Sequence, residues 1–238
     1  MRIEVLADAD AVAKKAAALI ATQARAAVAA RGRFVMAVSG GHTPWVMLRA
    51  LAEQDVPWKN VHTFQVDERV APEGHADRNL THLRESLLEQ APLPAQQIYA
   101  MPVEMPDLQS AAAKYAAELE RIAGSPPVLD LVHLGLGPDG HTASLVPGDP
   151  VLNVTDRDVA VTGMYQGRNR LTLTYPVINR ARQILFLVTG SEKAPMYKRL
   201  QAADPLIPAG RVVQTNAVLL ADNAAAGKRS DEGEREIA

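Results

Sequence analysis

The sequence predicts a doubly wound α/β fold, in which a mostly parallel sheet is covered by helices on both faces. Short apolar segments of strand length alternate along the chain with longer helical segments, the pattern of parallel strands joined by crossover helices. These strand segments are apolar throughout rather than at every second residue. Such strands are typical of a sheet that is buried on both faces, so both observations indicate the same fold class.

In the first half of the chain, strands and helices are expected in strict alternation. They cover residues 2–6 (strand), 9–30 (helix), 33–38 (strand), 44–52 (helix), 61–66 (strand) and 78–89 (helix). The segment 9–30 is rich in alanine, the residue that favours a helix most strongly. Thr43 is expected to cap the second helix and Pro44 to be its first residue, because these residue types are common at those positions.

The second half continues the same pattern. Strands are expected at residues 98–101, 128–134, 159–162, 171–174, 184–189 and 212–220. Helices are expected from a cap at Asp107 to about residue 121, over 191–202, and over a short alanine-rich segment capped by Asp222. The sequence shows no internal repeat and no long linker, so residues 1–227 are expected to form a single α/β domain. Residues 228–238 are expected to be a charged, disordered tail.

Composition narrows the classes of function. The chain has 238 residues, of which 47% are hydrophobic and 22% charged, enough for a stable globular core. It has no cysteine, which excludes disulfides, thiolate zinc sites and a cysteine nucleophile. A net charge of -2 and an aromatic content of 4% do not favour nucleic-acid binding, which needs a basic surface or stacking side chains.

The N-terminal residues do not resemble a targeting segment. They include Glu4, Asp8 and Asp10, whereas a signal peptide begins with basic residues and an unbroken apolar run. No apolar stretch approaches the roughly 20 residues that a membrane-spanning helix needs. We therefore expect a soluble, cytoplasmic protein with no membrane or nucleic-acid partner, present as a monomer or homodimer.

Candidate functional residues follow directly after the predicted strands. In open parallel sheets, ligands bind beyond the carboxyl ends of the strands, so these junctions are where a site is expected. Four junctions carry suitable residues: Ser39-Gly40-Gly41, Asp67-Glu68-Arg69, Gly137 to His141, and Gly190 to Lys193.

The first junction has the features of a phosphate site. Gly40 and Gly41 allow a ligand to approach the backbone, and the helix that follows offers unpaired N–H groups and a partial positive charge. The hydroxyls of Ser39 and Thr43 are candidates for further hydrogen bonds. The alternative is a glycine turn that serves only to reverse the chain.

The third junction carries the candidate acid/base. Asp139 and His141 lie two residues apart in a tight loop, and a carboxylate beside an imidazole can orient the ring and support its protonated form. The alternatives are a structural histidine, or a metal site for which no third ligand is evident. The other histidines are assigned structural roles: His42, His62, His75, His82 and His133.

The second and fourth junctions add charged candidates. Asp67 and Arg69 alternate onto one side of a strand end, where they either face a ligand or form a solvated ion pair of little energetic value. Lys193, in the first turn of a helix, either reaches back to an anion or is an exposed lysine. Arg168 and Arg170, just before a strand, offer guanidinium groups that suit phosphate.

The junctions extend into longer motifs. They are Ser39-Gly40-Gly41-His42-Thr43-Pro44, Val66-Asp67-Glu68-Arg69, Leu134-Gly135-Leu136-Gly137-Pro138-Asp139-Gly140-His141-Thr142-Ala143-Ser144-Leu145 and Gly190-Ser191-Glu192-Lys193-Ala194. In order and spacing, these motifs resemble those of the 6-phosphogluconolactonase family over nearly the whole chain. That family is similar in fold to the glucosamine-6-phosphate deaminases, so the resemblance implies a doubly wound α/β domain and a sugar-phosphate substrate.

The resemblance also implies roles for individual residues. It makes His141 the catalytic acid/base and puts Asp139 and Asp67 beside it. Its candidates for the substrate, several of them at the phosphate, are Ser39, Gly40, Gly41, Thr43, Arg69, Arg170 and Lys193. No metal ion and no organic cofactor is expected. The chain departs from the family pattern at Val146, where phenylalanine is common, and at Asp77-Arg78-Asn79, where Asp-Ser-Asn is commoner.

The implied reaction is hydrolysis of 6-phospho-D-glucono-1,5-lactone to 6-phosphogluconate, a step of the oxidative pentose phosphate pathway. The nearest alternative is a glucosamine-6-phosphate isomerase/deaminase. In those enzymes a glutamate shortly after the Asp-Gly-His motif supports the histidine, whereas residues 142–148 here contain no acid. A non-catalytic sugar-phosphate-binding regulator is the third alternative, but the sequence shows no helix-turn-helix pattern of the kind such regulators carry.

Overall fold

A computed structural model of the chain describes residues 1–228, and its centre is a seven-stranded sheet in which every pair of neighbours is parallel. In spatial order the strands are β1 (Arg2–Leu6), β10 (Ala217–Asp222), β9 (Ile184–Val188), β6 (Leu131–Leu134), β2 (Phe34–Val38), β3 (Val61–Gln65) and β5 (Ile98–Tyr99). The predicted α/β fold class is confirmed. The predicted tail lies outside the described residues, apart from Lys228.

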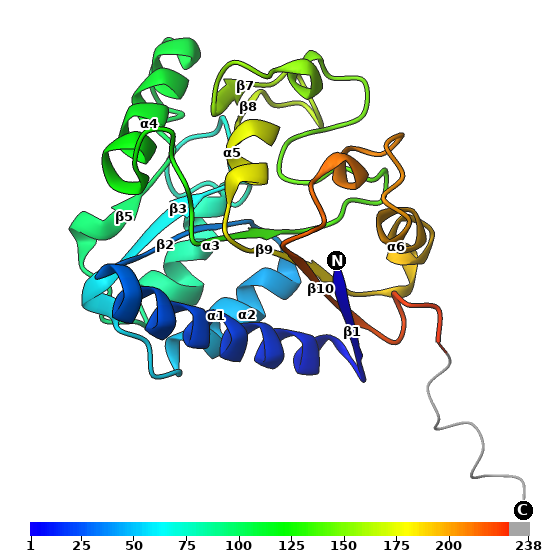
Figure 1. Cartoon of the computed structure of the whole chain (residues 1–238). Coiled ribbons are helices and arrows are strands. Elements are labelled where there is room, and N and C mark those ends of the chain that lie inside the picture. The colour runs from blue at the N-terminus through cyan, green and yellow to red at the C-terminus, as the bar shows by residue number, and fades with distance from the viewer. Residues whose placement is uncertain (229–238) are drawn as a thin grey trace, which may run out of the picture.

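Helices pack against both faces of this sheet (Figure 1). One face is covered by α1 (Ala9–Arg31), α2 (His42–Ala52) and α3 (Asn79–Leu83), the last of which continues through wider turns to Leu88. The other face is covered by α4 (Leu108–Ala123), α5 (Tyr175–Arg180) and α6 (Ala194–Gln201). Each face has its own apolar core. In α1 the buried stripe consists largely of alanines, whose small side chains allow the helix to lie close to the sheet.

The strand order reverses between β2 and β6, at the centre of the sheet. From β2 the chain winds outward to β3 and β5, and from β6 it winds in the other direction to β9 and β10. A crevice forms at such a reversal, because the connections on its two sides leave the sheet toward opposite faces. The junctions after β2 and β6, where the sequence places its glycine turn and its candidate histidine, therefore lie next to each other.

A second, three-stranded antiparallel sheet stands beside the first. It consists of β4 (Asp67–Arg69), β8 (Arg170–Leu173) and β7 (Val159–Val161), with β8 in the middle. The sequence predicts the strands β7 and β8 but not their separate sheet. In the register of this sheet, Arg69 lies directly opposite Arg170. Two residues that are about a hundred positions apart in the sequence are thereby brought together.

Several local predictions are wrong. Gly41, not Thr43, precedes α2, which begins at His42, and the Thr43 hydroxyl bonds instead to the Thr189 hydroxyl at 2.6 Å. The last strand lies later than predicted, and the segment after Asp222 forms turns in place of an alanine helix. Helix α5 was not predicted. Its six residues are too few to show helical periodicity. No helix among residues 1–228 has the length and apolarity needed to cross a bilayer.

A buried ion pair joins β4 to α3. Glu68 has no exposed surface and Arg78 is 1% exposed, and Arg78 Nε lies 3.2 Å from Glu68 Oε2. The carboxylate also accepts hydrogen bonds from the N–H groups of Arg69, Asn79 and Leu80, each at 2.8 Å. Arg78, one of the two departures from the family pattern, thus balances a charge beneath the segment that carries Asp67 and Arg69.

Replacing Arg78 with leucine is expected to lower the free energy of unfolding by about 3–5 kcal/mol, because it leaves the Glu68 carboxylate buried without its counter-charge. Urea denaturation of the variant measures this loss. The matched control is Arg84→Leu, which removes an exposed pair with Glu73 and is expected to cost less than about 1 kcal/mol. Equal losses of unfolding free energy in the two variants would show that the buried pair of Arg78 and Glu68 contributes no more to stability than an exposed pair.

Candidate active site

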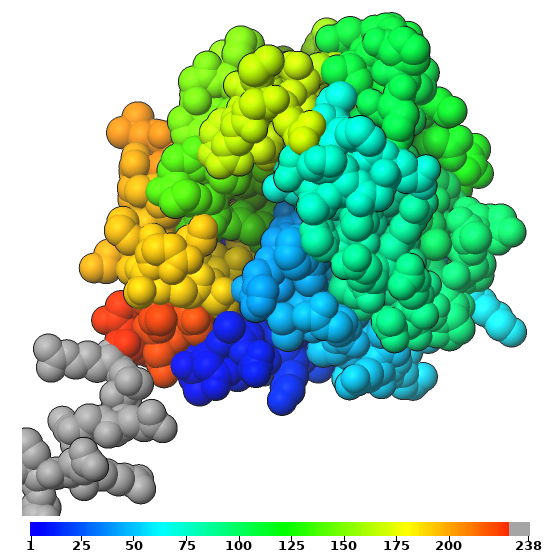
Figure 2. All heavy atoms as spheres, turned by 180° about the vertical axis from the view of Figure 1, so that it is seen from behind, coloured from blue at the N-terminus to red at the C-terminus, as the bar shows by residue number. Residues whose placement is uncertain are grey.

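A cavity of about 560 Å³ opens at the carboxyl edge of the central sheet, and all four predicted junctions line it. Figure 2 shows this face of the molecule, hollowed where the segments around residues 40 (blue), 140 (green) and 190 (yellow) meet. The residues predicted from the sequence that line the cavity are Ser39, Gly40, Gly41, Thr43, Asp67, Arg69, His141, Arg170 and Lys193. The remaining candidate, Asp139, does not line the cavity but contacts the His141 ring.

His141 forms a close pair with Asp139. The Nδ1 atom of its ring lies 2.6 Å from Asp139 Oδ1, and the same oxygen accepts a hydrogen bond from the His141 backbone N–H at 3.1 Å. The loop between them is tight, with the Gly137 N–H donating to the His141 carbonyl at 2.8 Å. A Cβ atom at position 137 would lie 2.1 Å from His141 Nδ1, so only glycine leaves room for the ring there.

The contact with Asp139 determines which nitrogen of the neutral His141 ring carries the proton. Partial burial alone would raise the pKa of Asp139, but hydrogen bonds from His141 and from the Tyr165 hydroxyl hold that pKa below its usual value. The carboxylate is therefore ionised near neutral pH and can only accept at His141 Nδ1, so the proton of the neutral ring sits on Nδ1. His141 Nε2 is then the basic nitrogen available for proton transfer.

Asp67 lines the same cavity but has other partners. Its side chain is almost fully buried, with Oδ2 accepting from the Ser144 hydroxyl at 2.6 Å and Oδ1 from Asn79 Nδ2 at 3.3 Å. The alternative of a solvated strand end is therefore wrong for this junction. The carboxylate in contact with His141 is that of Asp139, which answers a question that the sequence left open.

Arg69 and Arg170 form a cationic wall. They face each other across the β4–β8 ladder, where like charges normally destabilise a sheet. Arg170 is 4% exposed, and its burial together with the nearby charge of Arg69 lowers its pKa. Its Nε is buried without a hydrogen-bond partner among the described residues. An anion bound in the cavity would satisfy both the unbalanced charge and the unpaired donor.

The glycine turn after β2 is packed against this wall. A Cβ atom at position 40 would lie 1.9 Å from Asn79 Oδ1, and Asn79 in turn accepts a hydrogen bond from Arg69. Gly40 is therefore required by a close protein contact as well as suited to a ligand. The Ser39 N–H donates to His133 Nδ1 at 3.2 Å, so the free N–H groups at the start of α2 are the ones left for a phosphate.

The junction after β9 completes the cavity. Lys193 lies in a short 3-10 turn, Ser191–Lys193, that leads into α6. Gly190 has a φ of 95°, and its N–H donates to the buried carboxylate of Asp222 at 3.1 Å. Of the two arginines near β8, only Arg170 reaches this cavity. Arg168 pairs with Asp77 at 2.6 Å and lines a smaller neighbouring cavity.

His133 is the buried histidine beneath the site. Burial lowers its pKa to about 3, so the ring is neutral near neutral pH. Its Nδ1 accepts from Ser39, which places the proton on Nε2, and Nε2 has no partner among the described residues. This contact joins the glycine turn to the strand that leads to His141. His42, which the sequence assigns to a structural role, lines the cavity.

Three polar residues of the site were not among the predicted candidates. Asn79 contacts both Arg69 and Asp67, Ser144 binds Asp67, and Tyr165 binds Asp139. Asn79 and Ser144 stand within motifs that the sequence does single out, so their position was a usable signal. The sequence gives no such signal for Tyr165, because this residue reaches the site only through the pairing of β7 with β8.

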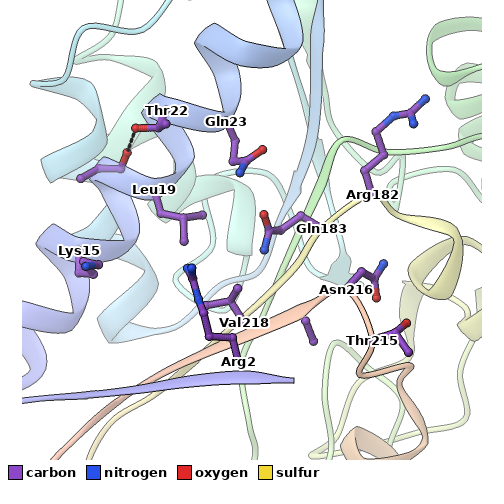
Figure 3. A pocket seen from close by; sticks show the side chains of 12 residues that line it. Arg2, Lys15, Leu19, Thr22, Gln23, Arg182, Gln183, Thr215, Asn216 and Val218 are labelled. Atoms are coloured by element: carbon purple, nitrogen blue, oxygen red, sulfur yellow. Dashed lines mark hydrogen bonds between the residues drawn. The ribbon is translucent and has the colours of Figure 1, made fainter.

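Among residues 1–228, no three His, Asp or Glu side chains are placed to hold a metal ion together. A second cavity of about 620 Å³ lies at the amino ends of β1 and β10, near Arg2, Lys15 and Asn216 (Figure 3). Lys15 there is paired with Glu4 at 2.8 Å, and none of the four junctions reaches it.

Comparison with known families agrees with the fold. The family model described as glucosamine-6-phosphate isomerases/6-phosphogluconolactonase matches residues 7–221. The chain therefore belongs to this group of sugar-phosphate proteins.

Individual relatives show to which of the two kinds of enzyme named in the family description the chain is more similar. The chain is 39% identical to the 6-phosphogluconolactonase of Synechocystis over 225 residues, which cover 92% of this chain and 93% of that protein. It is 37% identical to the 6-phosphogluconolactonase of Mycobacterium tuberculosis, with 95% and 97% covered. The crystal structure of 6-phosphogluconolactonase from Thermotoga maritima superposes with a TM-score of 0.82 at 28% identity, over 93% of this chain and 98% of that one. Within the group, the chain belongs to the 6-phosphogluconolactonase family.

The fold alone does not separate the two branches. A monomeric glucosamine-6-phosphate deaminase superposes with a TM-score of 0.83 over 96% of this chain, although its sequence is only 18% identical. The similarity in sequence, and not the architecture, places the chain among the lactonases.

The buried state of His133 predicts a pH dependence of stability. The unfolded chain binds a proton at this residue below pH 6.5, whereas the folded protein does so only near pH 3, so stability falls as pH is lowered through this window. Relative to His133→Asn, the parent protein is expected to lose about 1.4 kcal/mol for each pH unit below about 6.

Urea denaturation at several pH values between 4 and 7 measures this difference. The control is His75→Asn, which replaces a histidine whose side chain is 41% exposed and is expected to leave the slope of the parent protein in place. A His133→Asn variant whose stability falls in parallel with the parent protein would contradict the assignment.

Proposed function

We propose that the protein hydrolyses 6-phospho-D-glucono-1,5-lactone to 6-phosphogluconate, with His141 as general base and then general acid. One observation carries the proposal: a histidine oriented by a carboxylate stands in the wall of a cavity that also presents paired arginines, a lysine and a glycine turn at a helix start. The relatives at 37–39% identity that cover more than nine-tenths of the chain are named as 6-phosphogluconolactonases, which supports this substrate.

In the first half of the reaction, water attacks the carbonyl carbon of the lactone. His141 Nε2 takes a proton from the water as the bond forms, and Asp139 stabilises the resulting imidazolium through Nδ1. The product of this step is a tetrahedral carbon with a negatively charged oxygen. We assign the stabilisation of that oxygen to Arg69, which lines the cavity together with Asp67.

In the second half, the tetrahedral intermediate collapses. The bond between the carbonyl carbon and the ring oxygen breaks, and the imidazolium of His141 gives its proton to that ring oxygen as it leaves. The ring opens to a carboxylic acid, which ionises and releases one proton to solvent. One histidine thus serves both steps, and no electrons are transferred.

Binding of the phosphate positions the lactone for this chemistry. We assign the phosphate to Arg170, Lys193 and the glycine turn Ser39-Gly40-Gly41, with Thr43 at the start of α2. The positive charge of this wall binds the phosphate end of the substrate. The lactone carbonyl is thereby held in a fixed position and orientation relative to His141. Asp67, held by Ser144 and Asn79, offsets part of the charge of the two arginines.

The chemistry of the site favours the lactonase over the deaminase. A deaminase needs an acid shortly after the Asp-Gly-His motif, and residues 142–148 supply none. The reaction proposed here requires neither a metal ion nor an organic cofactor. A cytoplasmic location and a monomeric or homodimeric state remain predictions from the sequence.

Substituting His141 with alanine is expected to lower kcat by about 100- to 10,000-fold, because the variant loses general base and general acid together. Proton release from freshly made 6-phosphogluconolactone measures the rate, with spontaneous hydrolysis subtracted. An unchanged melting temperature serves as the control for folding. Near-normal turnover in this variant would refute the role of His141, and release of ammonia from glucosamine 6-phosphate by the parent protein would favour the deaminase.

Substituting Arg170 or Lys193 with alanine is expected to raise KM by about tenfold or more, because each removes a charged donor to the phosphate. The same proton-release assay, run over a range of lactone concentrations, gives KM. The control is Lys198→Ala, which removes an exposed lysine of α6 that does not line the cavity. If KM is unchanged in both Arg170→Ala and Lys193→Ala, the phosphate binds elsewhere.

A further inference from the structure

The loop between β7 and β8 is a tight hairpin at the edge of the active site. Tyr165 and Arg168 exchange two backbone hydrogen bonds, at 3.0 and 3.2 Å, across a turn formed by Gln166 and Gly167. Both turn residues have positive φ angles, 50° and 77°, as in the two-residue turns that match the twist of paired strands. The position of Tyr165 is therefore set by the register of this hairpin.

Two hydrogen bonds from Arg168 join the hairpin to the segment after β4, and a third, within the hairpin, joins its tip to Arg170. Arg168 Nε donates to the Asp77 carboxylate at 2.7 Å, and its Nη1 donates to the Val70 carbonyl at 3.3 Å. Gln166 Oε1 accepts from Arg170 Nη2 at 3.2 Å. These bonds tie the hairpin tip to the segment after β4 and to the cationic wall.

Tyr165 touches three groups that the proposed reaction uses. Its hydroxyl donates to Asp139 Oδ2 at 3.1 Å, on the oxygen that His141 does not occupy. Its ring meets the His141 ring edge to face, with the ring centroids 5.6 Å apart. The guanidinium carbon of Arg170 lies 4.9 Å from the centroid of the same ring. One side chain thus links the acid/base pair to the phosphate-binding arginine.

We propose that Tyr165 is a positioning residue for hydrolysis: its hydroxyl fixes the rotation of the Asp139 carboxylate against His141, and its ring holds Arg170 in the cavity wall. This inference rests on the proposed function of His141. The Asp139 side chain is 34% exposed, and both bonds from His141 go to Oδ1. Without the Tyr165 hydroxyl, water competes for Oδ2 and the carboxylate is less restricted in its rotation. The Tyr165 ring, which lies against the guanidinium of Arg170, likewise restricts the movement of the Arg170 side chain.

Tyr165 acts here as a donor and not as an acid. Burial and the neighbouring Asp139 carboxylate raise its pKa, so the phenol keeps its proton throughout the neutral range. The hydroxyl therefore remains able to donate to Asp139 while His141 changes its charge during the reaction. A phenylalanine at this position would preserve the ring and remove only the donated bond.

Comparison of two substitutions separates the two contributions. Tyr165→Phe keeps the ring under Arg170, so we expect kcat to fall by about tenfold with KM changed less than about twofold. Tyr165→Leu removes the ring as well, so we expect the same loss of kcat and an increase in KM of about two- to fivefold. A residue that served only to pack the hairpin would not give this division between kcat and KM.

The controls come from the same hairpin and the same site. Met164→Ala changes a neighbouring side chain that is 74% exposed, and it is expected to leave kcat and KM unchanged. Combining Tyr165→Phe with Asp139→Asn tests the route of the effect. If the hydroxyl acts through Asp139, the double variant has the same kcat as Asp139→Asn alone, and multiplied losses would contradict that route.

The outcome can be distinguished from failure of the proposed function by measuring His141→Ala in the same series. If His141→Ala is inactive and Tyr165→Phe has the kcat of the parent protein, only the inference about Tyr165 is overturned. If His141→Ala retains near-normal turnover, the proposed function itself fails. Melting temperatures of all variants show whether each loss occurs in a folded protein. A Tyr165→Phe protein that is folded, with kcat unchanged or KM raised as much as in Tyr165→Leu, contradicts the inference.

Discussion

The arrangement of the cavity depends on the buried carboxylate of Glu68. Its two oxygens accept bonds from three backbone N–H groups and from Gln65 Nε2, and they pair with the guanidinium of Arg78. Burying a charge in this way is costly unless its partners are complete. The partners come from β3, β4 and the start of α3, so satisfying Glu68 fixes these elements together. Asp67 and Arg69, on either side of Glu68, then point to the opposite side, into the cavity.

The charges of the cavity are arranged for an anion. Arg69 and Arg170 lie opposite each other in a sheet, and Lys193 reaches the same space from the end of β9. Asp67 offsets part of the repulsion between the two arginines. His141 lines the same cavity and has its own carboxylate partner in Asp139. In the reaction that we propose, the cations bind the phosphate and the oxyanion, and the pair of His141 and Asp139 transfers the proton.

The main features of the fold and much of the site could be predicted from the sequence. Apolar strands alternating with helices determine a parallel sheet, and the carboxyl ends of parallel strands share one edge. The junctions at Ser39, Asp67, His141 and Lys193 therefore had to lie near one another whatever the details of packing. The sequence also predicts a tight loop at Gly137. Only the structure shows why glycine is needed there, which is to leave room for the His141 ring.

What the sequence did not determine are contacts between segments that are distant in the chain. Three examples are the pairing of β4 with β8, the contact of Asp67 with Ser144 and the contact of Tyr165 with Asp139, all of which depend on how the second sheet is placed beside the first. Local propensity is set by neighbours within a few residues, whereas these contacts are set by register and burial across the whole domain. The sequence alone therefore determined the fold class and the edge of the sheet where the candidate site lies, and the tertiary structure decided which side chains meet there.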